Sequence, residues 1–348
     1  MVDLGAFYPY SPREHLRETL REYVPEYMLL AKWLADKERW ATELRAKVTE
    51  LLGPQPERCP LDIRLYHAER YYGYTAERIS YNSEAGIGIP AYICVPDNID
   101  TPIPAVICLH DRGPGKIDLI NPEGDQEAHP HHAFTRELAK RGYVTIAPDL
   151  RCFGECLADE AAMSALALLL GRPMLGLRVW DTIRALEVLE TRPEVRRDRI
   201  GCTGLGLGGL VTLFTAAVDE RIAAACVCGC LTTYQDMLLA ADGNLPGVSR
   251  DAASGEAFDH LPGLLRYADL YDVACLVSPR PLKMLQGTRD PGYVAPAAER
   301  CGRLIRQGYE ALGEKIKAEV ELFDGGRIYP GEPAYQFLDD WLKLGLET

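Results

Sequence analysis

The stretch IGCTGLGLGGLVTLFTAAV, residues 200–218, decides the fold because three kinds of local structure follow one another in it. Ile200 to Thr203 is a short apolar run, which is typical of a buried strand. The glycines between Gly204 and Gly209 predict a tight turn, because glycine adopts backbone conformations that other residues avoid. Leu210 to Val218 then has the composition of a helix. The sequence therefore predicts a strand that turns sharply into a helix.

The same alternation extends through most of the chain, and it implies a mostly parallel sheet covered by helices on both faces. The expected strands are two within Glu77–Pro96 around a turn at Glu84–Gly86, then Pro104–His110, Tyr143–Pro148, Ile200–Thr203, Ala223–Cys228, Leu282–Gln286 and Lys317–Phe323. The expected helices are His132–Arg141, Leu175–Leu189, Leu210–Val218, Ala295–Leu312 and Glu332–Leu344. We therefore predict an α/β fold.

Two segments depart from this pattern. Residues 1–55 contain apolar residues at helical spacing, interrupted by Pro25, and they predict an N-terminal helical extension. We expect these helices to pack on the body of residues 56–348, although they could instead form the contact of a homo-oligomer. Residues 231–266 are rich in Gly, Pro, Asp and Ser, and we expect a lid or rim insertion over the carboxyl ends of the strands, where open α/β sheets bind ligands.

Charge and composition exclude several classes of partner. The net charge of −13 argues against nucleic acid or an anionic membrane as the main partner, because both would repel this surface. The N-terminus lacks the basic and apolar parts of a signal peptide, and no apolar run reaches the length of a membrane span. The 11 cysteines lie mostly in apolar segments, which favours free buried thiols in a reducing compartment. We therefore expect a cytoplasmic protein.

The glycine-rich turn has the context of a nucleophile elbow, the motif G-x-S-x-G between a strand and a helix. Its small residues are required because the turn is tight, and its central residue presents a side chain to substrate. Here the central residue is Gly206, which carries no hydroxyl or thiol that could attack a carbonyl. We therefore predict an elbow that has lost its nucleophile.

A dinucleotide-binding loop is the alternative interpretation, since Gly204, Gly206 and Gly209 match G-x-G-x-x-G. Such a loop follows the first strand and is paired with an acidic residue about 20 positions later. This turn falls late in the sheet, and Asp219 and Glu220 lie too close to it. We therefore expect no nucleotide, and no other cofactor is indicated.

Several stretches together resemble the acetyl xylan esterase and dienelactone hydrolase branch of the α/β-hydrolases, from about Ile89 to the C-terminus. These stretches are RPMLGLRVWDTIRALEVLETRPEVRRDRIGCTGLGLGG, AVICLHDRGPGK, ELAKRGYVTIAPDLRCFGE, LPGLLRYADLYDVACLVSPRPL, QGTRDP and ELFDGG. The resemblance implies an α/β-hydrolase fold with an esterase-like active site at the elbow.

The resemblance assigns the three positions of a catalytic triad. It places the nucleophile at Gly206, the acid at Asp290 and the histidine at Arg327. Only the acid is present, and an arginine guanidinium stays protonated at any working pH, so Arg327 cannot act as the general base. We expect Asp290 and Arg327 to form an ion pair instead.

The oxyanion region also differs from the family pattern. The family commonly shows His-Gly-x-Gly after the first central strand, whereas this chain reads His110-Asp111-Arg112-Gly113. The extra carboxylate is unfavourable for a developing oxyanion, but the backbone amide of Leu207 could still donate one hydrogen bond. A pocket with Arg327 and this amide would suit a small acid or an ester carbonyl that is held without being cleaved. The alternative is that Arg327 only fills an inactive cavity and pairs with Asp290.

Two histidines could supply acid–base chemistry that needs no covalent nucleophile. His110 ends a strand and His260 lies in the lid, so both could face the pocket. Asp149, Arg151 and Glu155 follow another strand end, and we expect them to form hydrogen bonds within their loop.

Two further groups are similar to metal ligands only in residue type. His129, His131 and His132 lie in a polar stretch with no carboxylate or thiol at a fixed spacing, and we expect a surface loop there and no metal site. Cys226, Cys228 and Cys230 recur with period two, which predicts one face of a strand, and we expect these thiols, like that of Cys202, to pack in the core.

The leading hypothesis is an esterase-like protein that has lost hydrolysis and binds a small acyl or carboxylate ligand, or a protein partner. A second hypothesis is a lyase, isomerase or cyclase that uses His110, His260 or Asp290. A third is an active carboxylesterase whose nucleophile is another Ser, Cys or Thr.

Overall fold

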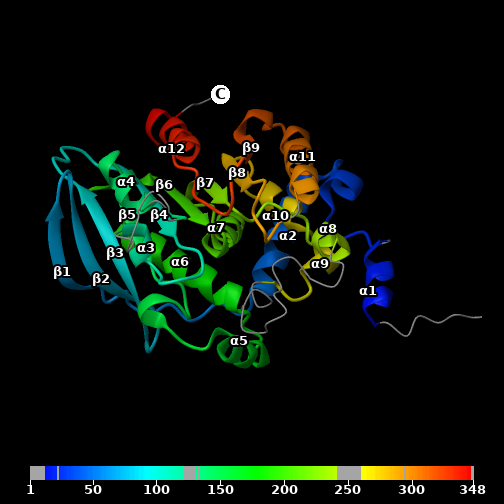
Figure 1. Cartoon of the computed structure of the whole chain (residues 1–348), viewed down its shortest axis with the longest axis horizontal. Coiled ribbons are helices and arrows are strands. Elements are labelled where there is room, and N and C mark those ends of the chain that lie inside the picture. The colour runs from blue at the N-terminus through cyan, green and yellow to red at the C-terminus, as the bar shows by residue number, and fades with distance from the viewer. Residues whose placement is uncertain are drawn as a thin grey trace, which may run out of the picture.

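The computed structural model describes residues 12–21, 23–120, 130–131, 133–240, 260–293 and 295–345. One nine-stranded sheet runs through the molecule in the order β1-β2-β3-β5-β4-β6-β7-β8-β9 (Figure 1). Its strands are β1 Arg64–Tyr71, β2 Tyr74–Glu84, β3 Ile87–Pro96, β4 Ile103–Leu109, β5 Val144–Pro148, β6 Val195–Leu205, β7 Ile222–Cys228, β8 Leu282–Gly287 and β9 Ala318–Phe323. The pairs β1–β2, β2–β3 and β3–β5 are antiparallel, and the other pairs are parallel, so the α/β-hydrolase arrangement is confirmed.

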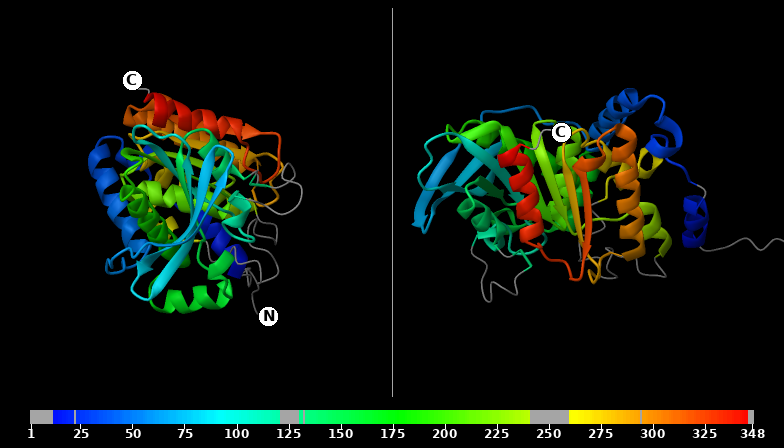
Figure 2. Two further views of the ribbon diagram at one scale, coloured as in Figure 1. Left: turned by 90° about the vertical axis from the view of Figure 1, so that its left-hand side faces the viewer. Right: turned by 90° about the horizontal axis from the view of Figure 1, so that it is seen from above.

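Helices cover both faces of this sheet (Figure 2). The α-helices are α1 Pro12–Arg21, α2 Lys37–Leu51, α3 Ile117–Ile120, α4 Phe134–Lys140, α5 Glu160–Leu169, α6 Met174–Glu190, α7 Leu207–Val218, α8 Tyr234–Ala240, α9 Leu264–Tyr267, α10 Leu270–Cys275, α11 Ala295–Leu312 and α12 Glu332–Leu338. Short π- or 3₁₀-helical turns are Leu29–Trp33, Gly154–Cys156, Lys315–Lys317 and Asp339–Leu344. Side chains of α2, α6, α7, α10 and α11 form one core, and those of α4 and α12 form a second core on the opposite face.

The strand and helix around the elbow form because both are buried. Strand β6 is buried from Ile200 to Leu205, and α7 is buried along Leu207–Ala217. The predicted strand, turn and helix are therefore confirmed, with the helix beginning three residues earlier than its apolar run. Every element expected from the alternation is present, whereas β1 was not expected. Its side chains are exposed at every position, so it carries no core-facing alternation that a sequence pattern could reveal.

The N-terminal extension packs on the body. Trp40, Leu44 and Val48 lie one helical turn apart on α2 and are completely buried in the main core. The side chain of Arg45 donates hydrogen bonds to the carbonyls of Ala217 (3.0 Å) and Leu276 (3.0 Å). The expected packing is confirmed for α2, and a role in oligomerisation stays a prediction.

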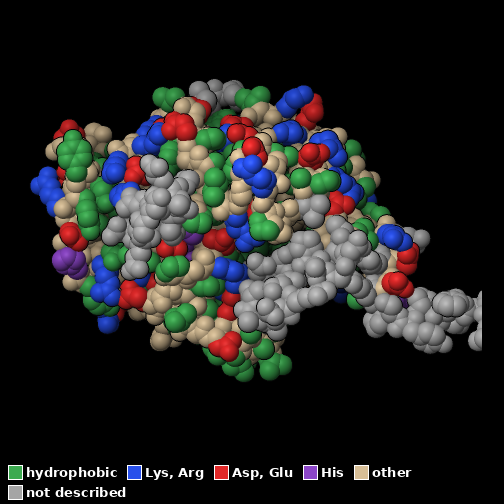
Figure 3. Space-filling view, in the orientation of Figure 1, with side chains coloured by type: hydrophobic (Ala, Val, Ile, Leu, Met, Phe, Trp, Pro, Cys, Tyr) green, Lys and Arg blue, Asp and Glu red, His purple; other side chains and the backbone are tan. Residues whose placement is uncertain are grey.

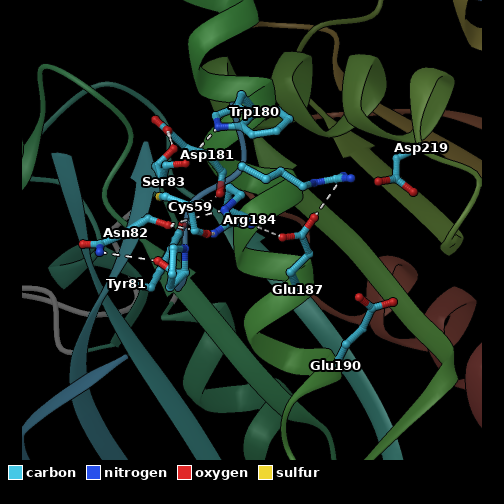
Figure 4. A network of polar contacts seen from close by, with 12 residues as sticks. Cys59, Tyr81, Asn82, Ser83, Trp180, Asp181, Arg184, Glu187, Glu190 and Asp219 are labelled. Atoms are coloured by element: carbon cyan, nitrogen blue, oxygen red, sulfur yellow. Dashed lines mark hydrogen bonds and ion pairs between the residues drawn. The ribbon is translucent and has the colours of Figure 1, made fainter. Parts of the chain in front are cut away.

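A polar network fixes the linker that follows this extension (Figure 4). Arg184 of α6 donates to the carbonyls of Cys59 (2.5 Å) and Asn82, and it forms an ion pair with Glu187. Asp181, one turn earlier, accepts a hydrogen bond from Ser83. The linker is thus attached to the same helix that covers β2.

The surface mixes acidic and basic side chains, with hydrophobic side chains gathered over α5 (Figure 3). Leu157, Leu166, Leu169 and Leu170 are exposed in and around that helix. Among the described residues no single helix has the length and hydropathy needed to cross a membrane; α5 and α6 reach them only when combined, and they bend by 94° at the break between them.

Candidate active site

The turn between β6 and α7 has the geometry of the elbow that the sequence predicts. Gly206 adopts φ 56° and ψ −115°, which is strained for any residue with a side chain. Its amide donates a hydrogen bond to the Cys228 carbonyl (2.8 Å), which fixes the turn against β7. A Cβ atom on Gly204 would lie 2.4 Å from the backbone of Gly208, so only glycine fits there. The elbow is intact in shape and lacks only the reactive side chain.

The carboxylate of Asp111 occupies the space above Gly206. The Leu207 amide donates a hydrogen bond to Oδ1 of Asp111 (2.9 Å). A Cβ atom built on Gly206 would lie 2.3 Å from Cγ and from both carboxylate oxygens of Asp111. The side chain of Asp111 therefore fills the place where the side chain of a nucleophile would begin, and it uses the amide that would donate to an oxyanion.

Arg327 joins this carboxylate to that of Asp290. Its Nε donates to Oδ1 (3.3 Å) and Oδ2 (3.1 Å) of Asp290, which confirms the predicted ion pair. Its Nη1 lies 3.8 Å from Oδ2 of Asp111. Burial by itself would lower the pKa of the Arg327 guanidinium, but the charges of Asp111 and Asp290 and the nearby Tyr293 raise it above its ordinary value. Arg327 therefore stays charged between two carboxylates.

Asp290 is fixed by further hydrogen bonds. Its Oδ1 accepts from the Gly292 amide (2.9 Å), and its Oδ2 accepts from Nε2 of Gln286 (3.3 Å). The side chain of Asp290 is 0% exposed. Because these donors hold both of its oxygens, Asp290 serves to hold Arg327, and it is not among the residues that line the pocket.

Two histidines hold the backbone of Asp111. Nδ1 of His110 donates to the Asp111 carbonyl (2.6 Å), while Nε2 of His110 accepts from the Leu150 amide (2.9 Å). Nε2 of His131 accepts from the Asp111 amide (2.9 Å). The prediction that His110 faces the pocket is wrong, because it is fully buried and both ring nitrogens bond to backbone groups. Burial also lowers the pKa of His110, which keeps the ring neutral.

The expected surface loop is wrong for His131, which is buried, and its Nδ1 lies 3.8 Å from Oδ2 of Asp118. His129 and His132 lie outside the described residues. Within the described part of the chain no three His, Cys, Asp or Glu side chains gather in a way that could hold a metal ion. The structure therefore supports a positioning role for His131, whose Nε2 accepts a hydrogen bond from the Asp111 amide. No pattern in the sequence indicates this role.

The pocket lies beside Asp111 and is partly open to solvent. Its apolar wall comes from Leu210, Met237, Leu270 and Tyr293. Met237 belongs to α8, at the start of the predicted lid, and His260 lines the pocket from near the other end of that segment.

His260 is the histidine that the structure does bring to the pocket. Its ring packs edge-on against Tyr234, with centroids 5.1 Å apart. Its Nδ1 is buried and forms no hydrogen bond within the described residues. Burial lowers the pKa of His260, so the ring is neutral at neutral pH. Arg112, also expected at the pocket, lines it while pairing with Glu160.

Cys230 corrects a prediction about the cysteines. Cys226 and Cys228 lie on β7 in the core beneath α12, as expected, and Cys202 is in the opposite core. Cys230 is buried in the same core as Cys202, as expected, but it follows the end of the strand, so it lines the pocket and does not share the face of Cys226 and Cys228. Burial raises the pKa of its thiol to about 12, so Cys230 is not a thiolate nucleophile at neutral pH.

The loop after β5 serves structure, as expected. Asp149 is fully buried and accepts from the amides of Lys116 (2.8 Å) and Glu155 (2.9 Å) and from the Lys116 ammonium (2.6 Å). Arg151 pairs with Asp181, with Nε 2.7 Å from Oδ2. These contacts fix the loop on which Leu150 holds His110.

A pair of buried carboxylates attaches α8 and the N-terminal extension to α10. Asp269 accepts from the amides of Tyr234 (2.7 Å) and Gln235 (3.1 Å). Asp272 accepts from the Leu29 amide (3.0 Å). Burial, together with the nearby charge of Asp269, raises the pKa of Asp272 to about 8. One wall of the pocket and the extension therefore depend on the same two side chains.

Known proteins share this architecture. The Bacillus subtilis (strain 168) protein named "Putative hydrolase YtaP" is 28% identical over 309 residues, which cover 86% of this chain and 99% of that protein. A solved structure described as a "putative acetyl xylan esterase" from Bacteroides fragilis has a TM-score of 0.76 at 21% identity and covers 93% of this chain and 84% of its own. The glucuronoyl esterase from Solibacter usitatus has a TM-score of 0.67 at 14% identity, with 91% and 97% covered.

At these identities the two solved structures show a common fold. Membership rests on the family model, which matches residues 11–309 and so takes in the elbow, Asp111 and Asp290. The chain therefore belongs to the Abhydrolase family, the α/β-hydrolases, with the architecture of the acetyl xylan esterases.

Proposed function

We propose that this protein binds a small acyl or carboxylate compound at the elbow without hydrolysing it. The observation that carries the proposal is the Asp111 carboxylate, which fills the nucleophile's space above Gly206 and accepts from the Leu207 amide. Hydrolysis through an acyl-enzyme needs a nucleophile, a base and an oxyanion donor. In this chain the first two are replaced, and the third is already in use.

The side chains near the elbow support this proposal. Arg327 cannot accept a proton at any working pH. The thiol of Cys230 is protonated, and the hydroxyl of Thr232 donates to the Thr233 carbonyl (3.2 Å). The ring of His260 is neutral and could act as a base, but its buried Nδ1 accepts a hydrogen bond from neither the Cys230 thiol nor the Thr232 hydroxyl.

The groups around Asp111 are suited to a carboxylate or a carbonyl oxygen. A backbone amide at the start of a 12-residue helix and a guanidinium both favour negative charge. The apolar wall would cover the hydrocarbon part of such a ligand. Related folds described as acetyl xylan and glucuronoyl esterases act on esters, and a retained affinity for the acyl part of an ester agrees with that ancestry.

The test is hydrolysis of p-nitrophenyl acetate by the native protein and by a variant with Asp111→Gly, Gly206→Ser and Arg327→His. All three changes are needed, because a serine at position 206 would collide with Asp111. The variant with Asp111→Gly and Arg327→His but Gly206 unchanged is the control. We expect an inert native protein and turnover only in the triple variant. Turnover by the native protein, with an acyl group or a fluorophosphonate mapped to one of its residues, would contradict the proposal.

A second candidate is a non-hydrolytic enzyme that uses His260 as acid or base. The buried Nδ1 of His260, with no hydrogen bond among the described residues, is the observation in its favour. His110 and Asp290 are removed from this candidate because their polar atoms are held by other groups. Conversion of hydroxy or unsaturated acids, followed by NMR and lost in His260→Gln, would support it over simple binding.

A further inference from the structure

We propose that Asp111 is a tethered competitor: its carboxylate occupies the ligand's own site, and a free monocarboxylate binds by displacing it. This inference rests on the proposed function and adds the ligand's charge and the way in which access to the site is controlled. Its starting point is that the elbow already holds a carboxylate, supplied by the chain.

The surroundings of Asp111 are those of a bound ligand. Oδ1 accepts from the Leu207 amide at 2.9 Å, and Oδ2 faces Nη1 of Arg327 at 3.8 Å. The two donors come from separate parts of the chain, the start of α7 and the loop after β9. Asp111 is 9% exposed and lines the pocket, so its carboxylate lies at the boundary between the donors and the cavity. A ligand in the cavity would meet this carboxylate first.

Displacement requires only a side-chain rotation. The amide and carbonyl of Asp111 are held by His131 (2.9 Å) and His110 (2.6 Å), both of which are buried. The backbone can therefore stay in place while the carboxylate leaves the Leu207 amide. On leaving, the carboxylate gives up one charge-assisted hydrogen bond to the Leu207 amide and its ion pair with Arg327, and an incoming carboxylate would form both in its place.

Charge balance selects the ligand class. Among the described residues, Arg327 lies between the carboxylates of Asp290 and Asp111, so a ligand that displaces Asp111 takes the place of one negative charge. A monocarboxylate restores the original balance, whereas a neutral amide or ester does not. The wall of Leu210, Met237, Leu270 and Tyr293 favours a short apolar group on that acid. The ligand we infer is a small monocarboxylate with an apolar tail.

The test is titration calorimetry with sodium propionate on the native protein, Asp111→Ala, Asp111→Asn and the double variant Asp111→Ala with Arg327→Gln. If Asp111 fills the site about nine-tenths of the time, its removal should tighten propionate binding about tenfold. Asp111→Asn should gain less, because an asparagine oxygen can still accept from Leu207. The double variant should lose the gain, and propionamide, the uncharged match of propionate, should show none.

Equal affinity for propionate in the native protein and in a folded Asp111→Ala would overturn the exchange while leaving the proposed binding function in place. Binding by neither protein would overturn both the exchange and the carboxylate ligand, whereas the hydrolysis test would still decide whether the esterase activity is absent. Circular dichroism and thermal unfolding check that each variant is folded. Should Asp111→Ala fail to fold, Asp111→Asn decides: no gain over the native protein counts against the exchange.

Discussion

Adding a single methyl group at the elbow should be far more destabilising while Asp111 is present than after it is removed. In Gly206→Ala the new Cβ atom would lie 2.3 Å from three atoms of the Asp111 side chain, so that side chain must move. A residue other than glycine in this backbone region costs about 1–3 kcal/mol. Losing the charge-assisted hydrogen bond to Leu207 costs about 1.5–3 kcal/mol more. We therefore expect the free energy of unfolding to fall by about 2.5–6 kcal/mol.

In the Asp111→Ala background the collision is gone, and Gly206→Ala should cost only the backbone strain of about 1–3 kcal/mol. Gly331 provides a matched control, because its φ of 69° and ψ of −104° are close to those of Gly206. A Cβ atom there would lie 3.6 Å from its nearest contact, a ring carbon of Tyr335. Gly331→Ala should therefore report strain without collision.

Urea unfolding of the native protein, the two single variants and the double variant gives the coupling between positions 111 and 206. We expect about 1.5–3 kcal/mol, equal to the hydrogen bond that the methyl group displaces. A coupling below about 0.5 kcal/mol, within the scatter of independent sites, would refute the placement of Asp111 in the nucleophile's space.

Three further outcomes are expected. Because the folded pKa of Asp272 is raised to about 8, the folded state binds more protons than the unfolded state between the ordinary value of 3.8 and about 8, so stability should fall as pH rises through that range, by at most about 1.4 kcal/mol per pH unit. Urea midpoints at pH 5.5 and 7.5 should therefore differ less in Asp272→Asn than in the native protein, and an unchanged difference would count against the raised pKa of Asp272. Cys230, with a pKa of about 12, should resist iodoacetamide at pH 7 until the protein is denatured, as mass spectrometry can show, whereas rapid alkylation in the folded protein would revive a thiol nucleophile. Trp40→Ala should lower the free energy of unfolding by about 3–5 kcal/mol, since Trp40 is completely buried, while Leu16→Ala on the exposed side of α1 should have little effect; similar losses would contradict the packing of α2 on the body.

The fold could be predicted because its signals are local. Each central strand is an apolar run, each covering helix has a helical period, and the turn at Gly206 is made of glycines. The exposed strand β1 has no buried face and left no such signal. The resemblance to the family, and not a local pattern, assigned Gly206, Asp290 and Arg327 to the positions of a triad, and in the structure these residues follow β6, β8 and β9.

The role of Asp111 could not be predicted in the same way. Its carboxylate reaches Leu207 across 96 residues of sequence, and that meeting depends on the conformation of the loop after β4. The conformation of the same loop buries His110 and places Nε2 of His131 within hydrogen-bonding distance of the Asp111 amide. His110 therefore does not face the pocket, and His131 does not lie in a surface loop, as the sequence had predicted. Cys230 was misplaced for a related reason, because the strand ends at Cys228 and the period of two ends with it.

The interlocked elbow also limits how this protein could evolve. A serine introduced at position 206 alone would collide with the Asp111 carboxylate. A histidine introduced at position 327 alone would leave Asp111 and Asp290 without the cation that they share. Each single substitution toward a Ser-His-Asp triad should therefore lower the stability of the site before ester hydrolysis could appear. Under the proposed function, descendants of this chain would change which ligand the pocket binds more readily than they would gain ester hydrolysis.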